Sequence, residues 1–423
     1  MSKFLTFFVA CTLLITKTSA QITLDTISIG AGYTQQVWYK IESDKEAKAP
    51  TNNWDLAFST RISRDASIWV NPNATLYRAS APISAWATMQ VDTNALTPDK
   101  QQFNADSVWY TGAFNYTGDN LFNYGWGTYN FISHNVVGDS VYVMKTVTGA
   151  WKKIYIEKLA YDTSYFVRYA DLNGQNEKTF ELKKKSFAGK YFGYYSFASD
   201  NIVDRDPLSK DWDLVAWRYI GLTPNPATGK LENYPLTGIF SSDEARVAKV
   251  RDERVDISRL DYKTQINVIG ADWKSFSPQT NRWAVADSTA YYVKVSSGKI
   301  YRIVFTGFGG SANGNMIFTK QVLTTSSVKD PLNGIASLGV YPNPVTDGNI
   351  TIVYDLGKNI NEAQTTDIQL FNMAGQTIFA QKAQNTEGVQ QITLPLLDLK
   401  AGIYIARINW QGKSLTQKVV VKN

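Results

Sequence analysis

Cysteine and histidine are almost absent from this chain of 423 residues, which contains one of each, Cys11 and His134. Metal sites built from His and Cys ligands are therefore excluded within one chain, and Ser-His-Asp catalysis could use only His134. The sequence also lacks a Gly-x-Ser-x-Gly nucleophile elbow and a glycine-rich phosphate loop. These absences argue against the common hydrolase, zinc and nucleotide-binding classes, and we expect a protein that is not an enzyme.

Long runs of charge or of apolar residues are also scarce. Charged residues make up 19% of the chain, the formal net charge is +6, and the one basic run covers residues 183–185. A run this short is typical of a solvated strand end, so we expect no nucleic-acid partner. Beyond the N-terminus no apolar run is long enough to cross a bilayer, so no transmembrane segment is expected.

The first twenty residues have the pattern of a secretory signal peptide. Lys3 supplies a positive charge, "FLTFFVACTLLIT" an apolar core, and "TSA" a small-residue cleavage site before Gln21. Cleavage after Ala20 would remove Cys11 and leave an exported chain without thiols or disulfides. Lipidation at Cys11 is the alternative.

The remainder is predicted to be all-β. Tyr, Phe and Trp number 24, 20 and 12, and aromatic and β-branched residues recur in short alternating runs separated by turn residues. Only residues 242–258 resemble a helix, with Ser241 or Ser242 as a cap and a thin stripe of valines.

Two stretches of the chain resemble each other in the order of their motifs. "VWYKIES" precedes "NNWDLAFST" at residues 52–60, and "GYYSFAS" precedes "KDWDLVAWR" at residues 210–218. Each copy continues into a strand, a Lys, a turn with Gly and a second strand, which predicts a hairpin. The order predicts two tandem β modules, at residues 21–183 and 184–325.

The repeated Trp-Asp-Leu motif has a catalytic and a structural interpretation. Glycosidases need two carboxylates in one cleft, but Asp55 and Asp213 fall in different modules. We therefore predict that Trp54 and Trp212 are core anchors and that both aspartates accept backbone N–H bonds.

Composition changes at residues 326–337, which read as a linker, and residues 338–423 then show short alternating runs typical of a small β-sandwich. "LGVYPNPVTDGNITI", "LFNMAGQTI", "LKAGIYIARI" and "KVVVKN" occur there in this order. This C-terminal part resembles the type A sorting domain of the type IX secretion system of Bacteroidetes. The resemblance implies recognition by the secretion machinery and a secreted or outer-membrane surface-attached protein.

The tandem modules resemble the HmuY family on shorter motifs: "WDLAF" early, "YPLTGIF" in the middle and "YVKVSSGKIY" late. The resemblance covers residues 25–325 and is better in the second copy. It implies a haem-binding scaffold with two axial side chains. A bis-histidine pair is impossible with one His, so His134 with Met89 or Met144, or two methionines including Met316, would have to serve.

Carbohydrate is the alternative ligand. The stretch at residues 109–130 interleaves aromatic residues with Gly and Asn and has no counterpart in the second module. Four of its rings are candidates for stacking on a ligand: Trp109, Tyr116, Tyr124 and Trp126. The expectation is a secreted or surface-attached, non-catalytic binding protein for haem or a glycan, or else an adhesive or structural surface protein.

Overall fold

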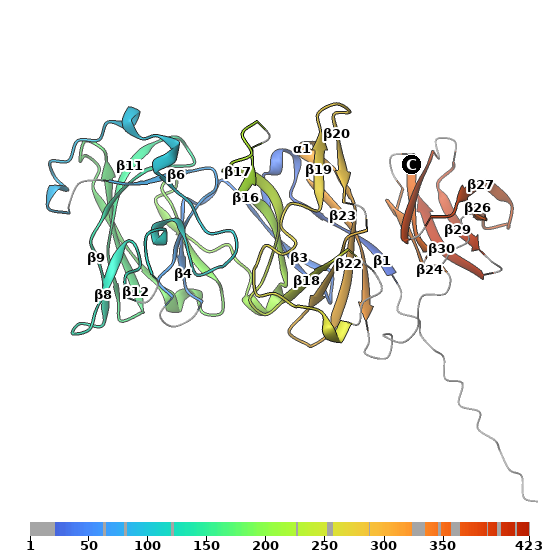
Figure 1. The fold of residues 1–423 in the computed structure, drawn as a ribbon, viewed down its shortest axis with the longest axis horizontal. Helices are drawn as coiled ribbons and strands as arrows, with labels where there is room; N and C mark the ends of the chain where they lie inside the picture. Colours follow the sequence, from blue (N-terminus) through green and yellow to red (C-terminus); the bar gives the residue numbers. More distant parts are fainter. Residues whose placement is uncertain are drawn as a thin grey trace, which may run out of the picture. The chain divides into compact units, whose positions relative to one another are not determined.

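The computed structural model describes residues 22–61, 65–79, 83–119, 122–225, 227–251, 257–286, 288–323, 335–345, 348–356, 364–386, 388–395, 399–410 and 413–422. The predicted signal peptide, with Cys11, and most of the predicted linker lie outside these ranges. Within them the chain is built of antiparallel strands and one short α-helix, α1 (Gly310–Asn313), which confirms the all-β prediction (Figure 1). It divides into two compact units: residues 24–320 form one, and the residues from Gln321 onward, grouped with those up to Thr23, form the other.

The first unit contains two β-sandwiches. Sandwich I has an inner sheet in the order β15-β14-β4-β5, formed by β15 (Asn201–Val203), β14 (Phe192–Ser196), β4 (Leu56–Ser59) and β5 (Ile68–Val70). Its outer sheet has the order β13-β12-β11-β10-β6-β7, formed by β13 (Lys178–Lys183), β12 (Ser164–Asp171), β11 (Trp151–Ala160), β10 (Val141–Lys145), β6 (Thr75–Arg78) and β7 (Gln101–Gln102). The hairpin of β8 (Gly127–Asn130) and β9 (Asn135–Gly138) joins this outer sheet through β11.

Sandwich II repeats this plan. Its inner sheet has the order β17-β16-β2-β3, formed by β17 (Leu231–Ser241), β16 (Leu214–Pro224), β2 (Gln35–Lys40) and β3 (Lys45–Pro50). Its outer sheet has the order β1-β23-β22-β21-β18, formed by β1 (Ile22–Ser28), β23 (Asn315–Leu323), β22 (Ile300–Phe308), β21 (Ala290–Lys294) and β18 (Arg246–Val250). A separate hairpin consists of β19 (Lys274–Ser277) and β20 (Arg282–Val285).

Alternating side chains build the core of each sandwich. Leu56 and Phe58 of β4 point into sandwich I and meet Tyr142 and Met144 of β10 in one buried cluster, while Ala57 between them points the other way. In sandwich II, Tyr39 of β2 packs edge-on against Phe318 of β23, with ring centroids 5.9 Å apart. Strand alternation therefore gives each inner sheet one face for its own core and a second face that packs elsewhere.

The strands pair differently from the expected division at residues 183 and 184. The first hairpin, β2–β3, pairs through β2 with β16 of sandwich II, and the second hairpin, β14–β15, pairs through β14 with β4 of sandwich I. β1 and β13, which precede these hairpins, likewise pair with β23 and β12. Residues 54–206 thus form sandwich I, and residues 22–50 join residues 212–323 in sandwich II. The two sequence copies have exchanged their N-terminal strands.

Local turn chemistry agrees with the sequence. The hairpins β10–β11 and β21–β22 both turn at a glycine with positive φ, Gly149 at 88° and Gly298 at 85°. In each, the glycine N–H donates to the carbonyl three residues earlier, that of Thr146 or Val295, at 2.9 Å. The predicted repeat of strand, Lys, turn and strand is therefore confirmed at these two hairpins.

The helix expected over residues 242–258 is wrong for the described part of that segment. Residues 246–250 form β18, which pairs with β21 along its whole length, and only a 3-10 turn follows at Ile257–Arg259. Val247 and Ala248 are both buried. Two adjacent buried side chains point to opposite faces of a strand, so this segment is buried on both faces. Pairing with β21 therefore stabilises a strand more than the thin stripe of valines would stabilise a helix.

The second unit is the predicted small β-sandwich. A sheet of β24 (Ile335–Tyr341), β25 (Asn349–Leu356) and β28 (Gly388–Pro395) packs against a sheet in the order β27-β26-β29-β30. The latter consists of β27 (Thr377–Gln384), β26 (Thr365–Asn372), β29 (Gly402–Trp410) and β30 (Lys413–Val421). Ile350 and Ile352 meet Ile368, Leu370 and Ile408 in its core. The last residues of the predicted linker belong to β24.

The exchange of hairpins makes a prediction about fragments. Residues 21–323 without the C-terminal unit, split between Asn173 and Gly174 in the β12–β13 turn, should yield two halves that are each unfolded alone, because each inner sheet would lack its hairpin. Mixed and refolded together, the halves should form a one-to-one complex, as measured by circular dichroism and size-exclusion chromatography.

The matched control is a split at residues 207–208, after β15. The first fragment then keeps sandwich I whole and should unfold cooperatively by itself. Independent folding of residues 21–173 or of residues 174–323 would contradict the exchange.

Candidate binding surfaces

Asp55, the first recurring aspartate, is a buried acceptor of backbone N–H bonds. Its Oδ1 accepts from Val147 at 2.9 Å and its Oδ2 from Phe197 at 2.8 Å. Burial raises the pKa of the Asp55 carboxyl above its ordinary value, and the two N–H donors partly offset that rise. Phe197 directly follows β14, so the carboxylate fastens the second hairpin to β4.

Asp213 has the equivalent role in sandwich II. Its Oδ2 accepts the N–H of Ile41, the residue after β2, at 2.9 Å, and its Oδ1 accepts from the Lys40 ammonium at 2.9 Å. The carboxylate fastens the first hairpin to β16. The prediction that both aspartates accept backbone N–H bonds is confirmed. Both carboxylates are engaged in hydrogen bonds that hold a hairpin.

Trp54 and Trp212 lie in a large cluster of buried side chains between the two inner sheets, most of them aromatic, which we call the aromatic layer. Sandwich I contributes one set of side chains and sandwich II a second, and all are buried. The members from sandwich I are Trp54, Ala57, Trp69, Trp109, Tyr191, Phe192 and Tyr194; those from sandwich II are Trp38, Ala49, Trp212, Val215, Trp217, Tyr219, Phe240 and Ile266. The prediction that Trp54 and Trp212 are core anchors is confirmed.

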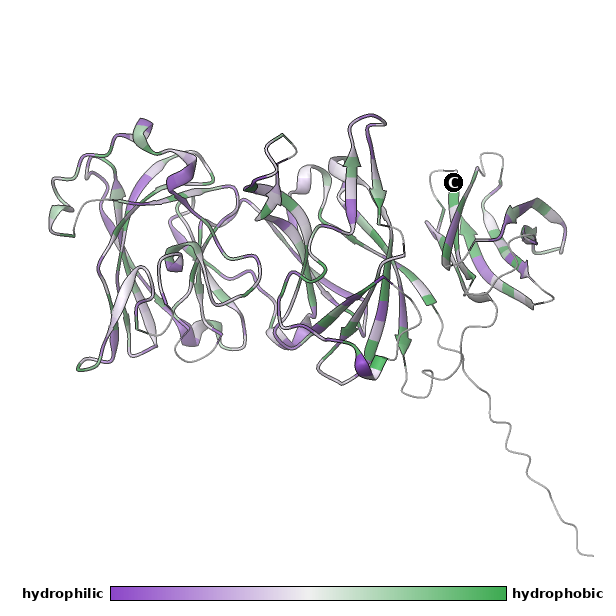
Figure 2. Cartoon of the chain, viewed as in Figure 1, coloured by the Kyte–Doolittle hydropathy of each residue, from purple (hydrophilic) through white to green (hydrophobic). Residues whose placement is uncertain are grey.

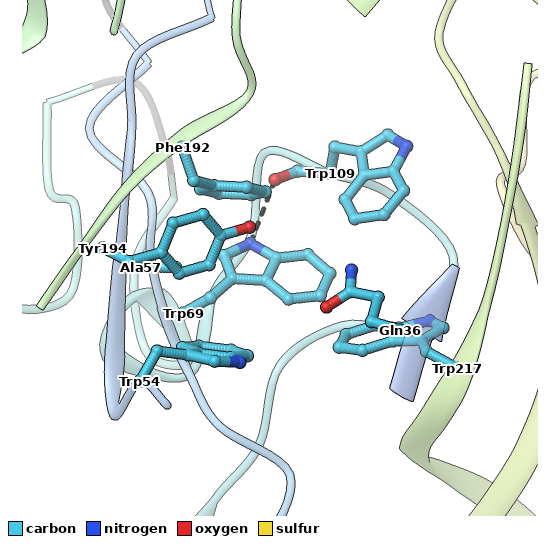
Figure 3. A pocket seen from close by; sticks show the side chains of 8 residues that line it. All are labelled: Gln36, Trp54, Ala57, Trp69, Trp109, Phe192, Tyr194 and Trp217. Carbon is cyan, nitrogen blue, oxygen red and sulfur yellow. Dashed lines mark hydrogen bonds between the residues drawn. The ribbon is translucent and has the colours of Figure 1, made fainter. Parts of the chain in front are cut away.

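A narrow pocket penetrates the aromatic layer (Figure 3). Trp69 lies at its centre and donates its indole N–H to the Trp109 carbonyl at 3.0 Å. The Trp217 Nε1 is buried and has no hydrogen-bond partner among the described residues. The free space holds about one water molecule, far less than a sugar ring or a haem requires.

Arg205 closes one edge of the layer. Its guanidinium lies 4.9 Å from the ring centre of Tyr194 and 5.2 Å from that of Trp38. It donates to the Gln36 side-chain oxygen at 2.7 Å and to the Pro50 carbonyl at 2.9 Å. Because Arg205 and Tyr194 belong to sandwich I and the other three residues to the first hairpin, this cation holds the two sandwiches together.

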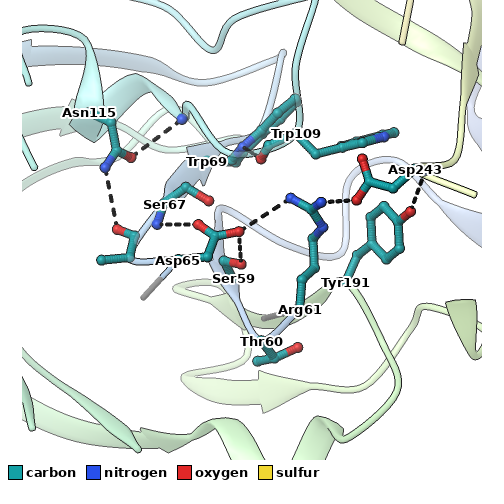
Figure 4. Close-up of polar contacts among 12 residues, drawn as sticks. Ser59, Thr60, Arg61, Asp65, Ser67, Trp69, Trp109, Asn115, Tyr191 and Asp243 are labelled. Carbon is teal, nitrogen blue, oxygen red and sulfur yellow. Dashed lines mark hydrogen bonds and ion pairs between the residues drawn. The ribbon is translucent and has the colours of Figure 1, made fainter. Parts of the chain in front are cut away.

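A polar network at another edge has the same effect (Figure 4). The Arg61 side chain, which is 7% exposed, pairs with Asp65 at 3.2 Å and with Asp243, which follows β17 of sandwich II. Its guanidinium lies 4.8 Å from the ring centre of Tyr191, whose hydroxyl accepts the Asp243 N–H at 2.7 Å. Ser59 completes the network by donating to Asp65 at 2.7 Å.

Two buried ionisable groups have strongly shifted pKa values. Burial raises the pKa of the Asp206 carboxyl to about 6, although the Tyr194 hydroxyl donates to it at 2.6 Å. Burial also lowers the pKa of the Lys274 ammonium to about 7, and Trp273 and Phe308 lie 4.4 and 4.7 Å from its nitrogen. Each group belongs to a packed interior rather than to an open cleft.

The four aromatic residues predicted to stack on a glycan have different environments. Trp126 is fully buried and donates to the Ala66 carbonyl at 2.9 Å, and Trp109 is buried in the aromatic layer. Tyr124 belongs to the core of sandwich I. Tyr116 alone of the four is exposed, at 60%.

The residues predicted to hold haem lie in separate environments. Met144 is in the core of sandwich I, Met89 packs in a small cluster with Trp86, and Met316 of β23 is fully buried. His134 lies in the exposed β8–β9 turn with φ of 54°. Its contacts are with tyrosines instead of methionines, and this arrangement does not favour a His–Met pair of axial ligands.

Around His134 the structure shows a group of rings in contact with one another, most of them exposed. Together with the exposed Ile132 beside Phe131 they form what we call the tip cluster, which draws on the β8–β9 hairpin, the segment before it and the β11–β12 turn: Phe122, Tyr129, Phe131, Ile132, His134 and Tyr161. Phe131 and Ile132 are 65% and 92% exposed. In Figure 2 the hairpin end, at the lower left, is coloured as hydrophobic.

Sequence reasoning predicted only His134 from the tip cluster. A signal was present: Phe131 and Ile132 stand between Asn130 and Ser133, where hairpin turns usually carry polar residues. Among the described residues, no group of three His, Cys, Asp or Glu side chains could hold a metal ion. In the same part of the chain, no helix is long and apolar enough to cross a membrane.

Comparison with known proteins assigns the C-terminal unit. Residues 339–422 match the family model described as the secretion system C-terminal sorting domain. The protein therefore carries a type IX sorting domain and is secreted or attached to the outer-membrane surface. The resemblance of residues 25–325 to the HmuY family stays a prediction.

No curated protein matches the chain. Among solved structures, trypsin-activated alpha-2-macroglobulin from Escherichia coli is similar with a TM-score of 0.16 and 9% sequence identity. The alignment covers 96% of this chain and 35% of that one, so the chain spans about a third of its length.

Replacing either recurring tryptophan should destabilise the protein. We expect Trp54→Ala and Trp212→Ala each to lower the free energy of unfolding by roughly 3–5 kcal/mol in urea titrations, because a large buried ring leaves a cavity. Tyr116→Ala, at an exposed position, is the control and should cost less than about 0.5 kcal/mol. Costs that small at both tryptophans would show that the aromatic layer is dispensable.

The raised pKa of Asp206 predicts a pH dependence of stability. Between pH 4 and 6 the folded protein binds a proton that the unfolded chain releases, so this contribution is present below pH 4 and is lost as the pH rises through 6. Relative to Asp206→Asn, the wild-type free energy of unfolding should rise by roughly 2 kcal/mol as the pH falls from about 7 to 4. Denaturant titrations at both pH values measure this difference. A difference independent of pH would contradict the assignment.

Proposed function

We propose that the exported chain is a non-catalytic binding protein of the cell exterior, and that it makes contact through the tip cluster. The observation that carries this proposal is the exposure of Phe131 and Ile132 at the end of the β8–β9 hairpin, 65% and 92%. Exposed apolar clusters on soluble proteins commonly mark interaction sites. The sorting domain supports this setting, because it delivers the chain to the outside of the cell.

A non-catalytic role is supported by the hydrogen bonds of the two recurring carboxylates. Asp55 and Asp213 are each committed to hydrogen bonds that fasten a hairpin, and the pocket between the sandwiches is filled by indole rings. The proposal invokes no haem, because His134 and the candidate methionines lie in separate environments. Because Trp109, Tyr124 and Trp126 are buried, the proposal assigns the contact surface to the exposed residues of the tip cluster instead.

The experiment uses the purified chain without residues 1–20, labelled with a fluorophore and added to washed cells of a type IX-secreting bacterium. We expect saturable retention that falls about tenfold in the double variant Phe131→Ser, Ile132→Ser, since these side chains dominate the exposed apolar surface of the tip cluster. The control is Leu222→Ser, Leu231→Ser on the β16–β17 ribbon, where both leucines are similarly exposed. Equal retention of the tip variant and the wild type would refute the proposal.

A further inference from the structure

The turn that carries Phe131 and Ile132 is held by its neighbours. The Asn130 side-chain oxygen accepts the N–H of Ile132 at 3.0 Å and that of Ser133 at 2.9 Å. His134 then takes a left-handed conformation and returns the chain to β9. The backbone of the turn is therefore held by Asn130. Phe131 rests against the rings of Phe122 and Tyr129 and stays 65% exposed, and Ile132 is 92% exposed.

Behind this apex lies a tier of rings that carry polar atoms. The Tyr129 hydroxyl hydrogen-bonds the His134 Nδ1 at 2.9 Å, and the rings of His134 and Tyr161 are 6.3 Å apart. The Asn135 side chain accepts the Tyr161 N–H at 3.0 Å and so joins the two turns. Rings with a polar edge prefer the boundary between an apolar phase and water.

Positive charge lies beside the second turn. Lys183, which pairs with Ser164 across the β12–β13 ladder, and Lys185 are both exposed. Glu181 lies 3.8 Å from the Lys183 ammonium, and the intervening Lys184 is buried and paired with Asp162. Exposed lysines next to an apolar tip favour an anionic surface.

From this order of apolar apex, amphipathic rings and lysines, we propose that the tip cluster binds a lipid surface. Phe131 and Ile132 enter the apolar layer, Tyr129, His134 and Tyr161 lie at headgroup depth, and Lys183 and Lys185 face anionic headgroups. This proposal deepens the proposed function and rests on it, since both need the tip cluster to be the contact surface.

A lipid surface fits this shape better than a glycan or a protein partner. The most exposed side chain, Ile132, is aliphatic and stands on a convex turn, whereas a sugar ring stacks on a flat aromatic face. A protein partner would need a matching pocket, but a lipid layer deforms around the apex. Weak insertion suffices for a chain already held at a cell surface, because its effective concentration there is high.

The experiment measures co-sedimentation of the chain lacking residues 1–20 with vesicles of phosphatidylcholine, alone or mixed with phosphatidylglycerol. We expect sedimentation with the mixed vesicles to fall about tenfold in Phe131→Ser, Ile132→Ser, and severalfold in Lys183→Gln, Lys185→Gln, the latter effect disappearing at high salt. Leu222→Ser, Leu231→Ser is the matched control and should sediment as the wild type does.

Two outcomes overturn the lipid assignment: no sedimentation of the wild type, or equal sedimentation of the wild type and the tip variant. If cells nevertheless retain the wild type and not the tip variant, the proposed function stands and the ligand is a surface protein or glycan. If the wild type and the tip variant behave alike in both the sedimentation assay and the cell assay, the proposed function is refuted as well.

Discussion

The aromatic layer between the two inner sheets is the contact on which the rest of the first unit depends. Each inner sheet is covered on one face by its own outer sheet and on the other by the aromatic layer. Strands β4, β14 and the first half of β16 are consequently buried on both faces. The sequences of such strands are nearly continuous apolar runs. The aromatic rings on them pack face to face or edge to face at distances that favour aromatic pairs. Trp69 and Trp109, for example, stack with centroids 5.3 Å apart.

The exchange of hairpins follows from the same layer. Each hairpin must present one face to its own core and the other to the aromatic layer, so it needs a firm attachment at its end. Asp55 and Asp213 supply that attachment through the N–H groups of Phe197 and Ile41. The motif therefore recurs because each copy of Trp-Asp-Leu places an aromatic anchor and a hairpin acceptor side by side on one strand.

Much of the local structure could be predicted from the sequence. Gly149 and Gly298 indicated two hairpins, and alternation in the C-terminal part indicated a small sandwich, because these features depend on neighbouring residues alone. The exchange could not be predicted, since the hairpins "VWYKIES" and "GYYSFAS" are alike and either could complete either sheet. Partner choice depends on contacts such as Arg205 with Gln36, which are distant in the sequence.

The candidate site was harder to predict for a related reason. Aromatic residues in the stretch 109–130 alternate with Gly and Asn, and the sequence does not tell which rings point inward. Trp109 and Trp126 are buried because their indole N–H groups find the carbonyls of Ser241 and Ala66, which belong to other segments. The exposure of Phe131 and Ile132 could not be predicted either, because it depends on the turn that the Asn130 side chain holds by accepting the Ile132 N–H.

Function is consequently confined to what the aromatic layer leaves free. The central strands of the inner sheets have no open face, and the junction of the sheets is closed by Arg205 and by the pair of Arg61 with Asp243. Contact surfaces then lie on the outer sheets and on exposed hairpins and loops. The tip cluster is such a surface, because β8 and β9 extend the outer sheet of sandwich I through β11, whereas the β19–β20 hairpin of sandwich II forms a separate two-stranded sheet. A scaffold made rigid by its buried tryptophans can hold such a tip in one conformation, and that fixed support lets a small exposed surface act as a binding site.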